Sequence, residues 1–262
     1  MKLTNRVELE IDTAPALGGR RGTFVFLHGA WCWNWYFKPF FLPYFAAHGF
    51  DVVAFSLRGH GASEGRAQLN GFSIDDYVED LRSVVATVER PVVVGHSMGG
   101  FVLQTYLTQA PLRGAVLLAS APPRPMVGMF VKSLLAQPLH LFHAVRKGQD
   151  FNREMLRQKM FSRGPEDTSM DAHLDNVQPE STRVAASMIT RRIANPETIR
   201  TPMQVIGAGR DRLVPPEAVA LTARAYRTQP VMFDTMSHML MLEPHWRDVA
   251  NAILRFEASL PV

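Results

Sequence analysis

The sequence predicts an α/β fold with a mostly parallel central β-sheet flanked by helices. Short apolar segments alternate with longer amphipathic ones along most of the chain, and this alternation is typical of strand–helix–strand units with parallel strands. The 262 residues are 47% hydrophobic and 20% charged. A chain of this composition can bury a large core and is far from the low-hydrophobicity, high-charge signature of disorder.

Seven segments are expected to form strands. Val7–Ile11 alternates apolar and charged residues, which indicates an exposed antiparallel edge strand. The other six segments are mainly apolar, short and typical of buried strands. They are Thr23–Leu27, Asp51–Leu57, Pro91–Val94, Ala115–Ala119, Met203–Ile206 and Val231–Phe233.

Four segments between or after these strands are expected to form helices. Ser73–Glu89 opens with a serine N-cap and repeats apolar residues along one helical face. Met98–Gln109 follows Pro91–Val94, the fourth of the seven expected strands. Pro215–Tyr226 begins with prolines, which the first turn of a helix tolerates. His245–Leu260 is amphipathic.

Residues 122–200 interrupt the alternation. They are helix-like, rich in Met and Arg, and contain no strand-like segment. We therefore expect a helical cap, or lid, over residues 122–200, inserted after the strand at 115–119 into a core formed by residues 1–121 and 201–262. This lid carries 12 basic and 8 acidic residues, an excess of +4 that equals the formal charge of the whole chain.

The charge of the lid leaves two interpretations open. One is a basic surface that attracts anionic substrates or makes transient contact with an anionic lipid surface. The other is a solvated helical face, which is the usual role of such charges. No run of like charges and no basic stripe interleaved with aromatics is present, so nucleic acid is not a predicted partner.

Other broad classes are disfavoured by composition. Cys32 is the single cysteine, so no intramolecular disulfide can form. No stretch approaches the ~20 apolar residues of a membrane helix, and the amino-terminal residues lack the continuous apolar region of a signal peptide. We expect a soluble, cytoplasmic protein without an integral membrane segment.

Ser97 is the candidate nucleophile. It lies in the GHSMGG segment (residues 95–100), directly between a predicted strand and a predicted helix. A serine in this context occupies a tight, strained turn that lifts its hydroxyl above the sheet, and the neighbouring glycines leave room for the strand and helix. The alternative is a glycine-rich turn without a chemical role, because the bare pattern is common by chance.

A nucleophilic serine needs a base, and the base needs an acid to orient it. His238 follows the last predicted strand, at the carboxyl edge of the sheet where open α/β sheets bind ligands. Asp211 follows the Met203–Ile206 strand at the same edge. Asp234 is a competing acid but lies too near His238 in sequence. We therefore expect Ser97, Asp211 and His238 to be the catalytic residues.

Acyl chemistry also needs donors for a developing oxyanion. The backbone N–H of Met98, directly after the nucleophile, is the first candidate. The second is the N–H of Ala30, in the His28-Gly29-Ala30-Trp31 loop that follows the Thr23–Leu27 strand. Taken alone, this loop is equally well explained as a tight turn closed by an aromatic residue.

Together these motifs resemble the serine α/β-hydrolase superfamily. The resemblance rests on His28-Gly29, the RGHGASEG segment (residues 58–65), the GHSMGG segment, Asp211 and His238, and it covers the chain apart from the lid. The order Ser, Asp, His along the chain is also that of this superfamily. The resemblance implies an α/β-hydrolase fold.

Features of several branches occur in the chain. RGHGASEG is similar to monoacylglycerol lipases and lysophospholipases, whereas HGAW and the segment after His238 are similar to plant-type esterases and hydroxynitrile lyases. The lyases carry a lysine after the catalytic histidine and a threonine beside the oxyanion loop, where this chain has Met239 and Gly29. Epoxide hydrolases and haloalkane dehalogenases use an aspartate nucleophile, so Ser97 argues against both.

The resemblance implies a serine hydrolase that cleaves small-molecule carboxylic esters with apolar or lipid-like acyl groups, through an acyl-enzyme. No metal or organic cofactor is predicted, because no metal-ligand or phosphate-loop motif is present. Acyl transfer, carbon–carbon bond hydrolysis and perhydrolysis on the same triad remain alternatives, as does a non-catalytic ligand-binding or receptor role. A substrate pocket is expected at Gly29, Trp31, Met126, Met129 and Met239, although such residues are more often ordinary core.

Overall fold

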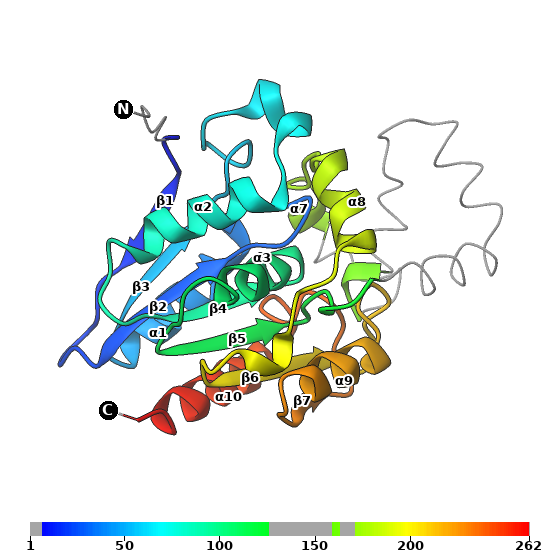
Figure 1. Ribbon diagram of the computed structural model, residues 1–262. Coiled ribbons are helices and arrows are strands. Elements are labelled where there is room, and N and C mark those ends of the chain that lie inside the picture. The colour runs from blue at the N-terminus through cyan, green and yellow to red at the C-terminus, as the bar shows by residue number, and fades with distance from the viewer. Residues whose placement is uncertain (1–6, 126–158, 163–170, 262) are drawn as a thin grey trace.

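The computed structural model describes residues 7–125, 159–162 and 171–261. Its strands form a seven-stranded sheet in the order β1-β3-β2-β4-β5-β6-β7 (Figure 1). The strands are β1 (Ile11–Ala14), β2 (Gly22–Leu27), β3 (Phe50–Phe55), β4 (Val92–His96), β5 (Gly114–Leu118), β6 (Met203–Ala208) and β7 (Pro230–Phe233).

The register of the sheet brings the functional loops to one edge. β1 pairs antiparallel with β3, and every other neighbouring pair is parallel. Leu27 at the end of β2 is paired with Gly95 of β4, and Gly95 with Leu117 of β5. The carboxyl ends of these strands therefore lie side by side. The predicted fold class, a mostly parallel sheet with an antiparallel edge, is confirmed.

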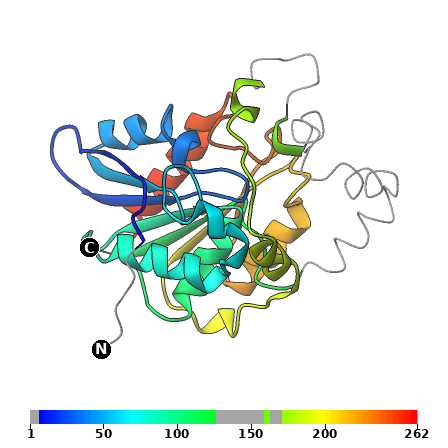
Figure 2. The same cartoon turned by 90° about the horizontal axis from the view of Figure 1, so that it is seen from above.

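Alternate residues of β2 define the two faces of the sheet. Phe24 and Phe26 belong to one buried cluster with α1 and α10, whereas Val25 and Leu27 belong to a second with α2, α3 and α9. Figure 2 shows α1 and α10 on one side of the sheet and α2 on the other. The helices are α1 (Phe41–Ala47), α2 (Ile74–Val85), α3 (Met98–Leu107), α9 (Pro216–Ala225) and α10 (Trp246–Ala258).

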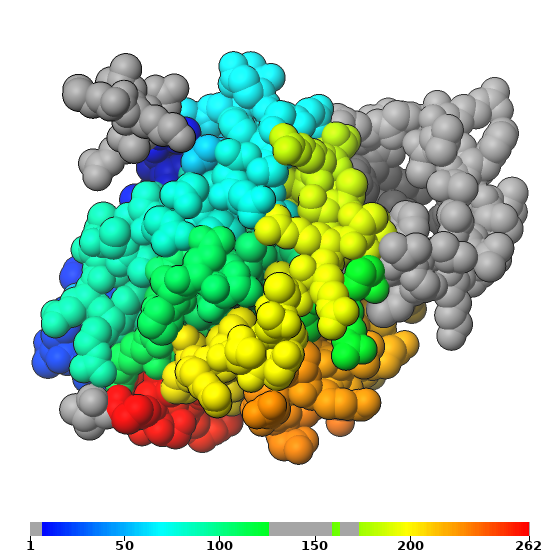
Figure 3. Space-filling view, in the orientation of Figure 1, coloured from blue at the N-terminus to red at the C-terminus, as the bar shows by residue number. Residues whose placement is uncertain are grey.

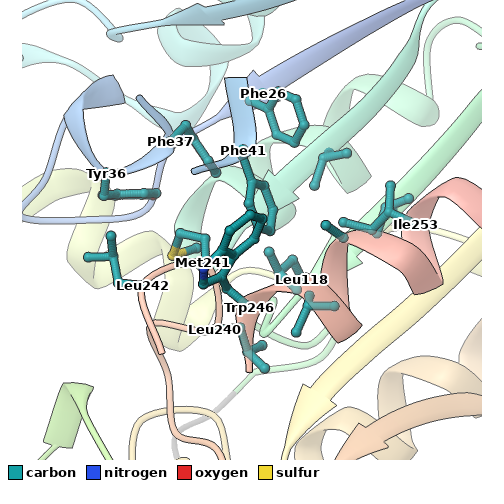
Figure 4. Close-up of a cluster of buried hydrophobic side chains, with 14 of the residues drawn as sticks. Phe26, Tyr36, Phe37, Phe41, Leu118, Leu240, Met241, Leu242, Trp246 and Ile253 are labelled. Carbon is teal, nitrogen blue, oxygen red and sulfur yellow. The ribbon is translucent and has the colours of Figure 1, made fainter. Parts of the chain in front are cut away.

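The cluster that contains Phe24 and Phe26 also contains the segment after β7. Leu240, Met241 and Leu242 are each at most 3% exposed. They belong to the same buried cluster as the aromatic rings of Phe41 and Trp246, and Figure 4 shows Leu242 next to Tyr36. Because these side chains are packed into the core, the backbone that precedes them, including residue 238, cannot move independently of the sheet.

One local prediction was wrong, and one helix was not predicted. Strand β1 begins at Ile11 rather than at Val7, because the earlier backbone bonds the loop after β3 instead: Glu8 O accepts from Glu64 N at 3.0 Å. Helix α1 was missed, because its sequence FLPYFAA has no clear periodicity and contains Pro43. That proline lies in the first turn, where it costs no hydrogen bond, and the helix buries Phe41 and Phe45.

The described part of residues 122–200 includes α7 (Asp171–Leu174), α8 (Thr182–Thr190) and the 3₁₀ turn η4 (Pro196–Thr198). Two bonds attach the start of α8 to the 3₁₀ turn η2 (Arg66–Gly71) and the residue after it. Ser181 Oγ donates to Phe72 O at 2.8 Å, and Thr182 N donates to Asn70 Oδ1 at 3.1 Å. Figure 3 shows this part of the chain (yellow-green) against the loop coloured cyan. The lid boundaries at 122 and 200 stay a prediction.

None of the helices within the described ranges combines the length and the apolar character needed to cross a lipid bilayer.

Helix α2 offers a test of local stability. Its N-cap Ser73 and Asp76 form a capping box: Asp76 N donates to Ser73 Oγ at 3.4 Å, and Ser73 N donates to Asp76 Oδ2 at 2.8 Å. We expect Ser73→Ala to lower the free energy of unfolding by about 1 kcal/mol, measured by urea denaturation. Ser83→Ala on the same helix is the control and should cost less. Equal losses in the two variants would contradict a capping role.

Candidate active site

Ser97 is the single residue between the end of β4 and the start of α3. Its backbone has φ 53° and ψ −115°, a conformation that costs a non-glycine residue on the order of 1–3 kcal/mol. The neighbouring strand holds it there, because Ser97 N donates to Leu118 O at 3.0 Å and Ala121 N donates to Ser97 O at 3.2 Å. The side chain is partly exposed although its neighbours in the turn are buried.

Two glycines make this turn possible by allowing close approach. A Cβ on Gly95 would lie 2.6 Å from Gly99 O, where β4 meets the first turn of α3. A Cβ on Gly29 would lie 2.9 Å from Ser97 Cβ and 3.0 Å from His96 Nδ1. The loop after β2 therefore lies directly against the candidate nucleophile.

Asp211 and His238 meet at the carboxyl ends of β6 and β7. His238 Nδ1 is 2.7 Å from Asp211 Oδ2, and both residues are at most 3% exposed. The other carboxylate oxygen, Asp211 Oδ1, accepts from Leu213 N and Val214 N, each at 2.8 Å. Asp234, the competing acid, is exposed. Because the carboxylate can only accept, His238 carries its proton on Nδ1 and leaves Nε2 for proton transfer.

The two loops that carry this pair are bonded to each other. Gly209 N donates to Phe233 O at 3.0 Å, and Arg210 N donates to Met236 O at 2.9 Å. These bonds continue the pairing of β6 with β7 beyond the strand ends. The separation of Asp211 and His238 is therefore fixed by backbone as well as by side chains.

His96 brings this pair next to the Ser97 turn. The His96 and His238 ring centroids are 4.8 Å apart, and His96 Nε2 is 3.1 Å from His238 O. Among the hydrogen bonds of the described residues, none joins Ser97 Oγ to His238. Catalytic hydrogen bonds often become short only in the substrate complex. The three candidate residues thus share one corner of the sheet edge.

The two candidate oxyanion donors lie on either side of this corner. Met98 is the first residue of α3, so its N–H has no acceptor within the helix. On the opposing loop, Gly29 N already donates to Tyr36 Oη at 2.6 Å. The next amide along that loop, the N–H of buried Ala30, is the candidate donor there.

Tyr36 and His96 form a buried network that sequence reasoning missed. Tyr36 Oη is 3.0 Å from His96 Nδ1, and both side chains are at most 2% exposed. Burial lowers the pKa of His96 well below its usual range, as does the nearby His238. Burial also raises the pKa of Tyr36. His96 is therefore neutral and Tyr36 keeps its proton.

The proton positions in this network follow from its two terminal groups, the carbonyl of His238 and the N–H of Gly29. The carbonyl of His238 can only accept, so His96 Nε2 donates to it and His96 Nδ1 accepts from the Tyr36 hydroxyl. Tyr36 Oη in turn accepts from Gly29 N. A continuous chain of three hydrogen bonds thus joins the candidate oxyanion loop to the backbone of the candidate base.

The expected substrate-pocket residues have different environments. Gly29 abuts Ser97, as described above. Trp31 is partly buried with φ 61°, and Met239 is 1% exposed, with its N–H donating to Met160 O at 3.0 Å. Met126 and Met129 lie outside the described residues. The structure thus places Gly29 against the candidate nucleophile and Met239 in the core beside the candidate base.

Within the described ranges, no group of three or more His, Cys, Asp or Glu side chains is arranged to hold a metal ion.

The alpha/beta hydrolase family matches residues 24–252 of the chain. This span is most of the sequence and includes the Ser97 turn, Asp211 and His238. The chain therefore belongs to the alpha/beta hydrolase family.

Comparison with individual proteins gives weaker, partial matches in sequence. The bifunctional esterase/perhydrolase DCH of Acinetobacter calcoaceticus is 33% identical over 111 residues, 40% of each chain. Epoxide hydrolase 3 of Xenopus tropicalis is 28% identical over 129 residues, 48% of this chain and 34% of that protein. The chain thus spans less than half the length of these curated relatives.

Similarity in structure extends over nearly the whole chain. An esterase from Exiguobacterium antarcticum superposes with a TM-score of 0.81 at 14% identity, covering 98% of this chain and 97% of that one. At this identity the likeness shows the shared fold alone.

The Tyr36 network provides a test. Tyr36→Phe leaves Gly29 N–H and His96 Nδ1 without their buried partner, and each unpaired group costs about 1–3 kcal/mol. We expect kcat for a carboxylic ester to fall about 10- to 100-fold, since ~1.4 kcal/mol corresponds to tenfold, while KM stays within about threefold. Steady-state kinetics measure both.

Tyr44→Phe is the matched control, because its hydroxyl bonds Asn251 Oδ1 at 2.8 Å on α10, away from the site. It should leave both constants unchanged. A Tyr36→Phe enzyme with the kcat of the unaltered protein would show that the network does not support catalysis.

Proposed function

We propose that the protein is a serine hydrolase that cleaves small-molecule carboxylic esters through an acyl-enzyme. The observation that carries the proposal is the buried Asp211–His238 pair, 2.7 Å between carboxylate and imidazole, packed beside the strained Ser97 turn. An oriented base next to a serine raised from the sheet is the arrangement that nucleophilic catalysis requires.

In the proposed first step, Ser97 Oγ attacks the ester carbonyl and its proton passes to His238 Nε2. Asp211 keeps the other ring nitrogen protonated and stabilises the imidazolium that forms. The N–H groups of Met98 and Ala30 donate to the oxyanion of the tetrahedral intermediate. The intermediate then expels the alcohol, which takes its proton from His238, and leaves the acyl group on Ser97.

In the second step, water attacks the acyl-enzyme. His238 accepts a proton from the water, the same two N–H groups hold the oxyanion, and Ser97 recovers its proton as the carboxylic acid leaves. The cycle consumes one ester and one water and releases one alcohol and one acid. It needs no group beyond the residues named here.

The rival reactions differ from ester hydrolysis in the nucleophile, the second substrate or the leaving group that they require. An aspartate nucleophile is excluded by the serine at position 97, which disfavours the epoxide-hydrolase activity in one relative's name. Perhydrolysis, present in another relative's name, acyl transfer and carbon–carbon bond hydrolysis use the same groups with another second substrate or leaving group. Ester hydrolysis is preferred over perhydrolysis and acyl transfer because its second substrate is water alone, whereas carbon–carbon bond hydrolysis differs from it in the leaving group.

The decisive experiment compares the unaltered protein with Ser97→Ala on a series of p-nitrophenyl esters of increasing acyl length. Activity that is lost in Ser97→Ala but kept in the control Ser83→Ala supports the proposal. Absence of activity on every ester would favour a non-catalytic binding role. Faster product formation with added alcohol or peroxide than with water alone would favour acyl transfer or perhydrolysis.

The choice of acid is tested separately. Asp211→Asn should lower kcat by orders of magnitude, about 10⁴-fold as for the equivalent change in a serine protease, because the amide favours the wrong imidazole tautomer. Asp234→Asn, at an exposed carboxylate, should change kcat little. Circular dichroism and thermal unfolding confirm that both variants fold. The reverse order of effects would show that the acid is Asp234.

A further inference from the structure

The segment Val177–Ser181, which belongs to the predicted lid, lies directly on the loop after β2. Gln178 N donates to Trp31 O at 2.9 Å, and Gln178 Nε2 donates to Cys32 O at 3.0 Å. Two successive carbonyls of the loop that carries Ala30 are therefore bonded by one residue. That residue is 9% exposed, so water competes little for these bonds.

The side-chain amide of Gln178 has a single possible orientation. Its oxygen, Oε1, accepts from Arg66 Nη1 at 2.6 Å and from Gly61 N at 3.3 Å. Its nitrogen faces a carbonyl oxygen, which can only accept. Rotating the amide by 180° would oppose oxygen to oxygen and nitrogen to nitrogen, so all of these contacts would be lost.

Gln178 is held in place on both sides. Arg66 Nη1 also donates to Gly59 O at 3.0 Å, which fixes the guanidinium to the RGHG loop. Two residues further along, buried Glu180 accepts from Tyr77 Oη at 2.8 Å and lies 3.1 Å from His60 Nε2. The segment is thus anchored to the core independently of its contact with the loop after β2.

The backbone that Gln178 bonds is strained next to the candidate oxyanion donor. Trp31 has φ 61°, a left-handed conformation that a residue with a Cβ adopts only when its surroundings impose it. Relaxation of Trp31 to a negative φ would turn the Ala30–Trp31 peptide relative to the Trp31–Cys32 peptide and so displace Ala30, whose own N–H lies in the preceding Gly29–Ala30 peptide. The bonds from Gln178 fix Trp31 O and Cys32 O, the carbonyls of Trp31 and the next residue, against which that change of path would occur.

We propose that Gln178 is a positioning residue that holds the N–H of Ala30 in place to stabilise the oxyanion. This role rests on the proposed ester hydrolysis, because it acts on that reaction's second oxyanion donor. Gln178 itself acts through the loop and does not touch the reacting atoms.

Two substitutions separate hydrogen bonding from packing. Gln178→Glu keeps the size of the side chain and an acceptor for Arg66 but replaces the donor to Cys32 O with an oxygen. Gln178→Leu removes both functions. Gln109→Leu is the matched control, because this exposed glutamine also accepts from an arginine, Arg82, but lies just beyond the carboxyl end of α3, away from Met98.

We expect kcat to fall about 10- to 100-fold in both Gln178 variants, with KM within threefold, and neither constant to change in Gln109→Leu. Hydrogen exchange read by mass spectrometry should be faster in peptides covering residues 28–37 and unchanged over residues 92–107. If Gln178→Glu keeps the original kcat and exchange rate, the proposal is overturned, even if Gln178→Leu is impaired.

The exchange measurement also separates this proposal from the proposed function. If the unaltered protein hydrolyses no ester, ester hydrolysis fails, whereas faster exchange over residues 28–37 in Gln178→Glu would still support the positioning of the loop. If the unaltered protein is an active esterase and the Gln178 variants match it in kcat and exchange, the positioning role alone fails.

Discussion

The strained turn at Ser97 is the constraint on which the rest of the site depends. A residue with a Cβ stays at φ 53° only where its surroundings exclude alternatives. Here β5 supplies the carbonyl of Leu118, the backbone at Ala121 supplies an N–H, and Gly29 lets the neighbouring loop approach within contact of Ser97. The parallel sheet makes this possible, because the ends of β2, β4 and β5 lie in register at one edge.

The hydrogen bonds of the buried His96 ring extend that constraint to the neighbouring loops. His96 follows Gly95 into the turn, and its two ring nitrogens bond Tyr36 on one side and the carbonyl of His238 on the other. Because burial keeps His96 neutral, one nitrogen donates and the other accepts, and the network has a single arrangement of protons. The loop with Ala30 and the loop with His238 are therefore fixed relative to the same turn.

Sequence reasoning predicted the sheet and the positions of Ser97, Asp211 and His238 in its loops because local patterns mark each of them. Each follows a short apolar segment, and Ser97 also has flanking glycines. It could not predict the partners of Tyr36 or Gln178. Tyr36 and His96 are 60 residues apart, and Gln178 and Cys32 are 146 apart, with no local pattern in between. Helix α1 was missed because burial of its aromatic rings, rather than periodicity, stabilises it.

The described residues of the predicted lid contact both loops of the candidate site. On the side of the base, Met160 O accepts from Met239 N at 3.0 Å, and Ser162 N donates to buried Glu243 at 2.7 Å. On the oxyanion side, Gln178 bonds two carbonyls. A change at these residues therefore acts on the two loops that carry the candidate base and the candidate oxyanion donor.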